Sequence, residues 1–114
     1  MRAIGLSIFV GAAALLTGAC VTSAAPMSEA AQAAKGRDLA AQYCASCHSI
    51  YDGTSPHPDA PSFADAANRY PPDMLAESLA EGIQVGHPDM PVFELDEESI
   101  DALVAYLWTL RDDG

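Results

Sequence analysis

The chain has 114 residues, which is enough for one domain, and it is strongly acidic, with 16 Asp and Glu against 5 Lys and Arg and a formal net charge of −11. This charge disfavours binding to nucleic acids and to anionic membrane surfaces, because both depend on Lys and Arg contacting phosphates. Half of the residues are hydrophobic, but many are alanine and the densest apolar block is N-terminal, so the folded core is smaller than the composition suggests.

The N-terminus has the layout of a secretory signal peptide. A positive start at Arg2 precedes an apolar stretch at residues 4–16, and small residues follow it. The apolar stretch is short for a membrane span. We therefore predict a signal peptide at residues 1–24, cleaved after Ala24, and a mature exported domain at residues 25–114. An uncleaved anchor helix is the alternative.

Cys20 allows a second interpretation of this segment. Residues 16–20, Leu-Thr-Gly-Ala-Cys, loosely resemble a bacterial lipoprotein signal in which Cys20 would carry the lipid, although the leucine lies one position too far upstream. Lipidation would tether the protein to a membrane. If cleavage instead follows Ala24, the remaining cysteines are Cys44 and Cys47.

The rest of the sequence predicts an all-α domain, since apolar residues recur at helical spacing and no alternating strand pattern occurs. Serine and aspartate are placed to cap the first and last helices, and a Pro-Pro pair to open the third. Helices are expected at residues 28–43, 63–69, 71–82 and 97–110, with N-caps at Ser28 and Asp96 and loops at residues 50–61 and 86–95.

Gly36 interrupts the first predicted helix. A glycine inside a helix costs about 1 kcal/mol relative to alanine. Its presence therefore indicates either a weakly formed helix or the close approach of another backbone.

The chemistry of the chain lies at residues 44–48, Cys-Ala-Ser-Cys-His. Residues three apart on a helical turn share one face, so the thiols of Cys44 and Cys47 can bond the two vinyl groups of one haem edge. His48 can then reach the iron from one side of the ring. With an export signal and no other cysteine in the mature chain, the motif predicts one covalently attached haem c.

The sequence supports three other functions of the cysteine pair less well. A thioredoxin-like redox pair needs a βαβ setting, which the helical flanks contradict. A zinc site would combine Cys44 and Cys47 with two of His48, His57 and His87, but a second closely spaced ligand pair is missing. A structural disulfide at this spacing would close almost no loop and would stabilise little.

The second axial ligand of the iron must come from another segment. The candidate methionines are Met27, near the chain terminus, Met74, in the first turn of the third helix, and Met90. Met90 is favoured because its loop contains two prolines, which hold a weak thioether ligand at low entropic cost. His87 is the rival, since imidazole binds iron more strongly, whereas His57 is interpreted as a loop residue.

With these residues in place, the sequence resembles the class I cytochromes c of bacteria, from Gly36 to the C-terminal end. The resemblance rests on the Cys-Ala-Ser-Cys-His motif, on Met90-Pro91, on the glycine eight residues before Cys44 and on Leu-Val-Ala-Tyr-Leu at residues 103–107. It implies the cytochrome c-like fold, in which helices wrap around one covalently attached haem. The first and last helices would cross at Gly36.

The resemblance also implies partners for individual residues. Gly36 is expected to pack against Tyr106 and Leu103, and the Pro61 carbonyl to accept the Nδ1 hydrogen of His48, which would orient the ring. Arg69 would bond a haem propionate, with simple exposure as the alternative. The expected walls of the haem pocket are Leu75, Leu79, Ile83, Val92 and Phe93.

Ligation by His48 and Met90 fills both axial positions and leaves no site for a substrate, so the expected function is single-electron transfer rather than enzymatic catalysis. The acidic surface predicts redox partner proteins with a basic docking patch, and the leader predicts the periplasm. Two alternatives remain: a cytochrome subunit of a larger dehydrogenase or oxidase complex, and a haem sensor or peroxidase-like protein if Met90 is not an iron ligand. Membrane contact would then come only through a lipid at Cys20 or through a membrane partner complex.

Overall fold

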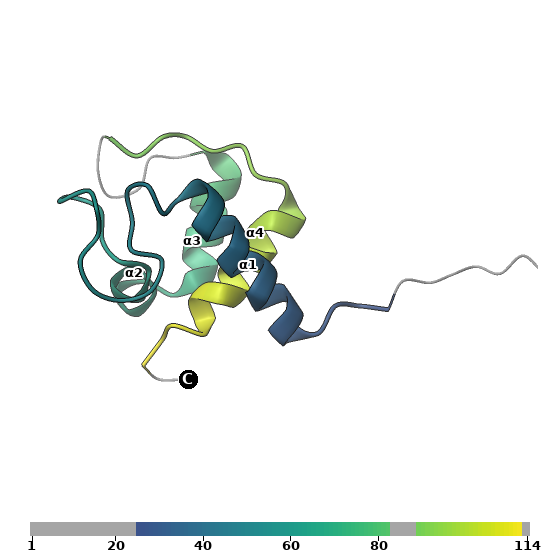
Figure 1. Ribbon diagram of the computed structural model, residues 1–114. Helices are drawn as coiled ribbons and strands as arrows, with labels where there is room; N and C mark the ends of the chain where they lie inside the picture. Colours follow the sequence, from purple (N-terminus) through teal and green to yellow (C-terminus); the bar gives the residue numbers. More distant parts are fainter. Residues whose placement is uncertain (1–24, 83–88, 113–114) are drawn as a thin grey trace, which may run out of the picture.

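Four helices form the part of the chain that the structure, a computed structural model, describes, which is residues 25–82 and 89–112. The all-α prediction is confirmed there, since those residues contain no strand. In chain order the helices are α1 (Glu29–Tyr43), α2 (Phe63–Arg69), α3 (Pro72–Glu81) and α4 (Glu97–Trp108) (Figure 1).

Several predictions concern residues outside this range. They are the signal peptide at residues 1–24 with Cys20, the pocket residue Ile83 and the rival ligand His87. None of the described helices is long and apolar enough to cross a membrane.

Side-chain caps begin three of the helices. The Ser28 hydroxyl oxygen accepts from the backbone N–H of Ala31 at 3.2 Å, and the Asp96 carboxylate accepts from that of Ser99 at 2.7 Å, so both predicted N-caps are confirmed. Ser62 caps α2 in the same way. The caps satisfy backbone donors that the first helical turn leaves without carbonyl partners.

Helix α3 ends as predicted, but α4 is shorter than expected. Gly82 closes α3 with a φ of 66°, a left-handed conformation that glycine adopts without strain. Helix α4 ends at Trp108 rather than Leu110, because the backbone N–H groups of Thr109 and Leu110 donate to carbonyls only three residues back. The helix therefore closes with a tighter turn.

Helices α1 and α4 cross and form the largest helix–helix interface (Figure 1). At Gly36 the α4 backbone lies so close that a Cβ atom would collide with the Ala102 carbonyl and stand 2.9 Å from Tyr106 Cβ. The predicted close approach at Gly36, with Tyr106 as a partner, is therefore confirmed. Leu103, the other expected partner, is not among the nearest groups. Its place is taken by the Ala102 backbone, because the helices meet at the carbonyl one residue earlier.

The buried core lies beside this crossing. Ala40, Ile50, Leu103 and Tyr106 form its centre, and the Tyr106 hydroxyl donates to the Ile50 carbonyl at 2.7 Å. That hydrogen bond joins the middle of α4 to the chain just after residues 44–48. The segment that carries the chemistry is thus fixed to the most buried helix.

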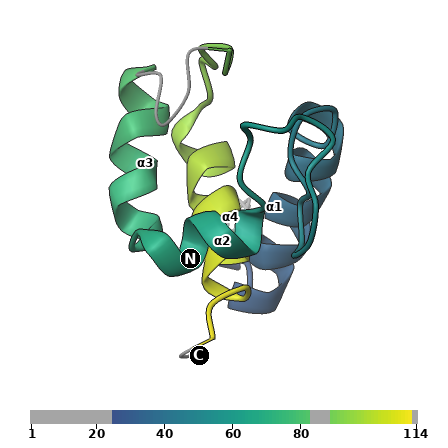
Figure 2. The ribbon, with the colours of Figure 1, turned by 90° about the vertical axis from the view of Figure 1, so that its left-hand side faces the viewer.

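The chain after α4 folds back onto α2. Arg111 donates to the Ala67 carbonyl at 2.7 Å, and Asn68 both donates to the Leu110 carbonyl and accepts from the Asp112 backbone N–H. Helix α3 packs on the other side of α4, so α4 stands between α1 and α3 (Figure 2). These contacts hold α2 and α3 in place around a shared cavity.

Candidate functional site

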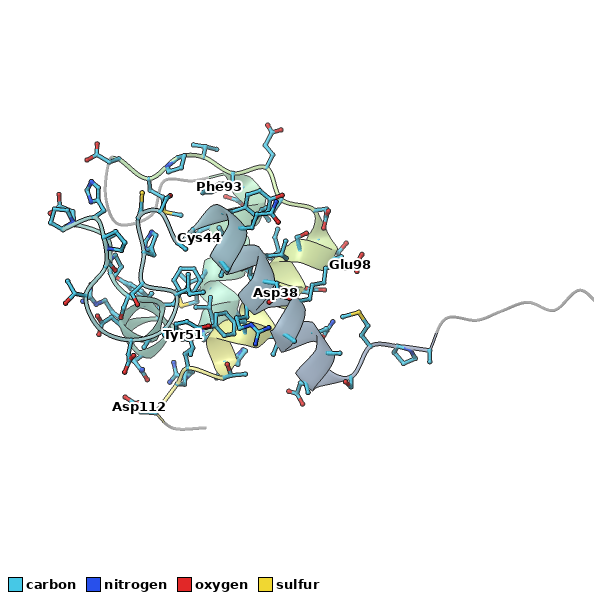
Figure 3. The ribbon with its side chains drawn as sticks, in the orientation of Figure 1. Asp38, Cys44, Tyr51, Phe93, Glu98 and Asp112 are labelled. Carbon is cyan, nitrogen blue, oxygen red and sulfur yellow. The ribbon has the colours of Figure 1, made fainter. Side chains whose placement is uncertain are left out.

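One apolar cavity of about 300 Å³ lies between α1, α2, α3, α4 and the segment at residues 89–95. In Figure 3, Cys44 extends α1 on one side of it and Phe93 comes from the segment at residues 89–95. Most of the remaining lining is aliphatic or aromatic. The site residues singled out in the sequence all line this cavity: Cys44, Cys47, His48, Pro61, Arg69 and Met90.

Residues 44–48 continue α1 as a further turn. The backbone N–H of Cys44 donates to the Ala40 carbonyl at 2.9 Å, and the N–H groups of Cys47 and His48 donate to the Cys44 carbonyl at 3.1 and 2.9 Å. This turn puts both thiols on the cavity side, as the spacing of the motif predicts. Both cysteines are reduced and half-buried.

The two thiols sit at the boundary between protein and cavity. Burial, together with the neighbouring Cys47 thiolate, raises the pKa of the Cys44 thiol to about 11. Cys44 is therefore protonated at neutral pH, and its sulfur faces the cavity as a thiol.

His48 is held by a hydrogen bond and by an aromatic neighbour. Its Nδ1 donates to the Pro61 carbonyl at 2.7 Å, and its ring lies edge-on to Phe63 with centroids 5.7 Å apart. Because the carbonyl can only accept, Nδ1 carries the hydrogen and the neutral ring has its lone pair on Nε2. This is the hydrogen bond that the resemblance to cytochromes c implies.

The loop between residues 49 and 62 keeps Pro61 within reach of His48. The backbone N–H of Phe63 donates to the Ser49 carbonyl at 2.9 Å, and that of Ala64 donates to the Tyr51 carbonyl at 2.8 Å. The start of α2 is therefore tied to the chain directly after the motif. The geometry of His48 follows from backbone bonds rather than from flexible side chains.

The cavity lining also includes a thioether. Met90 is half-buried and lines the cavity, whereas Met74, 62% exposed, and Met27, 46% exposed, do not line it. Of the three methionines, only Met90 therefore shares the cavity with His48. Arg69 lines it from the last turn of α2, where it is exposed.

The predicted pocket walls are correct for Leu75, Leu79 and Phe93 and wrong for Val92. Val92 is 58% exposed and lies outside the lining. Its Cγ1 atom instead stands 2.9 Å from where a Cβ on Gly82 would be, so it packs on the end of α3. In this irregular segment Phe93 faces the cavity, whereas its neighbour Val92 faces the end of α3.

Sequence reasoning missed several lining residues. Leu103 and Leu107 were recognised as part of the apolar stripe of the last helix, but a stripe does not say which neighbour it faces. Tyr43 is the last residue of α1 and Tyr70 directly follows α2, and neither carried a signal of this role. The missed members of the lining are Leu39, Tyr43, Ser46, Asp59, Phe63, Ala66, Tyr70, Ser78, Pro91, Leu95, Leu103 and Leu107.

The competing sites find no support in the described part of the chain. No group of three or more His, Cys, Asp and Glu side chains converges there as a metal cluster, so a zinc site would depend on His87, outside that part. The βαβ setting of a thioredoxin-like pair is absent from the same residues.

The residues around the cavity fit a haem. Apolar walls suit the macrocycle, two thiols stand on one edge, an imidazole held by a carbonyl lies beside them, and a thioether lies in the same cavity. Histidine with methionine is the ligand pair of cytochromes c. A helical domain with this set of groups is a c-type cytochrome.

Comparison with known proteins agrees with this class. The family model described as cytochrome c oxidase, cbb3-type, subunit III matches residues 31–107. Cytochrome c-552 of Bradyrhizobium diazoefficiens is 40% identical over 92 residues, which cover 80% of this chain and 86% of the relative. No solved structure gives a significant match. The chain therefore belongs to this cytochrome c family, whose small bacterial members carry electrons through haem.

Proposed function

We propose that this protein is an exported mono-haem electron carrier, with haem held through thioethers to Cys44 and Cys47 and with His48 and Met90 as axial ligands. One observation carries the proposal. Segments separated by more than forty residues bring the imidazole of His48 and the thioether of Met90 to the same apolar cavity. Both axial positions would then be filled by the protein, which suits electron transfer and leaves no place for a substrate.

When bound, haem supplies a one-electron Fe(III)/Fe(II) couple. The hydrogen bond from His48 to the Pro61 carbonyl fixes the tautomer of the ring and raises the basicity of Nε2. The neutral thioether of Met90 and the apolar walls disfavour an additional positive charge and so favour the reduced state. Arg69 bonds a propionate in this proposal, which its exposed position in the cavity lining supports.

Partners are proposed from the charge of the chain. With a net charge of −11, the surface favours a redox partner that presents a basic patch, and the encounter rate with it should fall as salt is raised. The periplasm is proposed from the signal-peptide layout of residues 1–24, with a lipid anchor at Cys20 as the alternative. Mass spectrometry of the purified protein tests haem attachment, the cleavage site and the fate of Cys20 together.

The axial ligand is tested by absorption spectroscopy of the ferric protein. We expect a thioether-to-iron charge-transfer band in the ferric protein, and a ferrous spectrum that does not change when carbon monoxide is added. Met90→Ala should abolish the band, whereas Met74→Ala is the matched control, since that methionine is exposed and lies outside the cavity lining. A band that survives Met90→Ala, or a wild-type protein without one, would overturn ligation by Met90 and favour a sensor or peroxidase-like function.

A second candidate is a cytochrome subunit of a membrane oxidase complex, favoured by the description of the matching family model. Purification from native membranes under mild detergent separates the two. Co-elution with oxidase subunits would identify a bound subunit. Recovery of the haem protein alone in the periplasmic fraction would identify a diffusible carrier.

A further inference from the structure

His57 and Asp89 connect two segments that both contribute residues to the cavity lining. The His57 Nε2 atom lies 3.6 Å from the Asp89 carboxylate, although the residues are far apart in the sequence. His57 belongs to the loop after the Cys-Ala-Ser-Cys-His motif, and Asp89 directly precedes Met90. No role in the proposed electron transfer has so far been given to either residue.

The imidazole of His57 is held in place before it meets Asp89. Its backbone N–H donates to the Cys47 carbonyl at 3.0 Å, its carbonyl accepts from the Ala60 N–H at 3.2 Å, and its Nδ1 accepts from the Asp59 N–H at 3.2 Å. Since Nδ1 accepts, the hydrogen of the neutral ring is on Nε2, the atom that points at Asp89. His57 is thus held in a fixed orientation on the loop that follows the Cys-Ala-Ser-Cys-His motif, which we call the haem-attachment loop.

The segment that carries Met90 is held differently at its two ends. Phe93 and Leu95 fix the far end, since both line the cavity and Leu95 packs against the buried core. Met90 itself is followed by Pro91, which limits the backbone conformations of the segment. At the near end, Asp89 is joined to the attachment loop through His57.

We propose that His57 is a positioning residue that keeps Met90 on the iron by tying Asp89 to the loop that holds the haem. This inference rests on the proposed axial ligation by Met90. A thioether is a weak ligand, so its occupancy depends on how often its loop moves away. The contact between His57 and Asp89 lowers that frequency, because it must break before the segment that carries Met90 can move away from the haem-attachment loop.

The size of the effect follows from the exposure of the pair. The side chains are 30% and 69% exposed, so the contact is a partly solvated one of modest strength. Its loss should raise the fraction of protein with Met90 off the iron by roughly two- to fivefold. The apparent affinity for an added ligand that competes with Met90 should rise by the same factor.

The test is imidazole titration of the ferric holoprotein, followed by loss of the thioether charge-transfer band. We expect His57→Ala and Asp89→Ala each to tighten imidazole binding by roughly two- to fivefold, and the double variant to add little to either. His57→Gln, which keeps an N–H donor in a similar place, should restore most of the wild-type affinity. Asp89→Ala removes an exposed side chain and keeps the test open if His57→Ala fails to fold.

Lys35→Ala is the matched control. It breaks an ion pair between distant segments, Lys35 with Glu98 at 2.6 Å, which joins α1 to α4 away from the cavity lining. It should leave imidazole affinity unchanged. The positioning role is overturned if imidazole affinity is unchanged in both His57→Ala and Asp89→Ala, or if Lys35→Ala shifts it equally. In either case, a charge-transfer band in the wild-type protein still supports ligation by Met90. A wild-type protein without the charge-transfer band overturns both the positioning role of His57 and the ligation by Met90.

Discussion

The crossing of α1 and α4 and the cavity beside it use apolar residues in opposite ways. At the crossing, protein packs on protein: the Gly36 backbone meets the Ala102 carbonyl, and Ala40 is fully buried next to Tyr106. Around the cavity, Leu75 and Leu79 of α3 and Met90, Phe93 and Leu95 are half-buried and face a shared space of about 300 Å³.

This difference separates what the polypeptide stabilises by itself from what it arranges for a cofactor. Small residues let α1 and α4 approach closely, but they bury little apolar area. Most of the larger side chains, such as Leu75, Leu79 and Phe93, lie on the cavity instead. A domain of this size with so small a protein-only core is marginal alone, so haem should contribute much of its stability.

The largest expected effect comes from preventing haem attachment. Cys44→Ser with Cys47→Ser removes both thiols, and the chain should then be largely unfolded, because the cavity side chains lose the apolar surface they would cover. Far-UV circular dichroism of the purified variant measures this as loss of most of the helical signal. Thr54→Ala, which changes an exposed residue outside the cavity lining, should keep the wild-type spectrum. A native-like apoprotein would show that the crossing of α1 and α4 suffices.

The second effect tests the crossing itself. Gly36→Val would place side-chain atoms against the Ala102 carbonyl, a backbone group that cannot rotate away, so it should cost about 3 kcal/mol or more in the free energy of unfolding. Denaturant unfolding of the holoprotein measures it. Ala34→Val, on the exposed side of α1, introduces the same residue and should cost only about 0.5 kcal/mol through helix propensity. Equal costs for the two variants would contradict the close approach.

The third effect concerns the hydrogen bond between the core and the haem-attachment segment. Tyr106→Phe leaves the buried Ile50 carbonyl without its hydroxyl donor and should lower the free energy of unfolding by about 1–2 kcal/mol. Tyr51→Phe is the control, because Tyr51 is 52% exposed and its change should stay within about 0.5 kcal/mol. The same unfolding assay compares them, and a Tyr106→Phe value as small as the control would remove the role of this bond.

Local features of the fold could be predicted from the sequence, and most long-range contacts could not. Helix starts follow from residues next to them, so Ser28 and Asp96 identify their own helices. The hydrogen bonds from Tyr106 to Ile50 and from Arg111 to Ala67 join distant positions and leave no periodic signal. The close approach at Gly36 was foreseen because a costly glycine and a family resemblance pointed to the same contact.

The candidate site was predicted better than its walls. The motif at residues 44–48 defines chemistry by spacing, Met90 was favoured by the two prolines of its loop, and Pro61 and Arg69 followed once the resemblance was recognised. All of these residues line one cavity. Val92 and Phe93 show the limit, since an irregular segment has no period that tells an inward residue from its outward neighbour. His87 lies outside the described residues, so the choice between it and Met90 belongs to the spectroscopic test.

The smallest expected effect lies at the start of α4 and depends on pH. Hydrogen bonds from Ser99, led by its backbone N–H, hold the pKa of the Asp96 carboxyl below its usual range. A carboxyl whose pKa is lower in the folded state stabilises the fold above its unfolded pKa, about 3.9, and loses that contribution as the pH falls through the folded pKa. Asp96→Ala should therefore lower the melting temperature at pH 6 and have less effect near pH 2.

Asp96→Asn separates the cap from the charge. Asparagine still accepts from Ser99 but does not titrate, so this variant should stay close to wild type at both pH values and approach it most closely in acid. Asp101→Asn, in the middle of the same helix, controls for the loss of one negative charge from an acidic protein. Melting curves of the four proteins between pH 2 and pH 6 make the comparison. If the melting temperatures of Asp96→Ala and Asp101→Asn change in parallel across that range, the effect is one of net charge. The carboxylate cap would then not stabilise the start of α4.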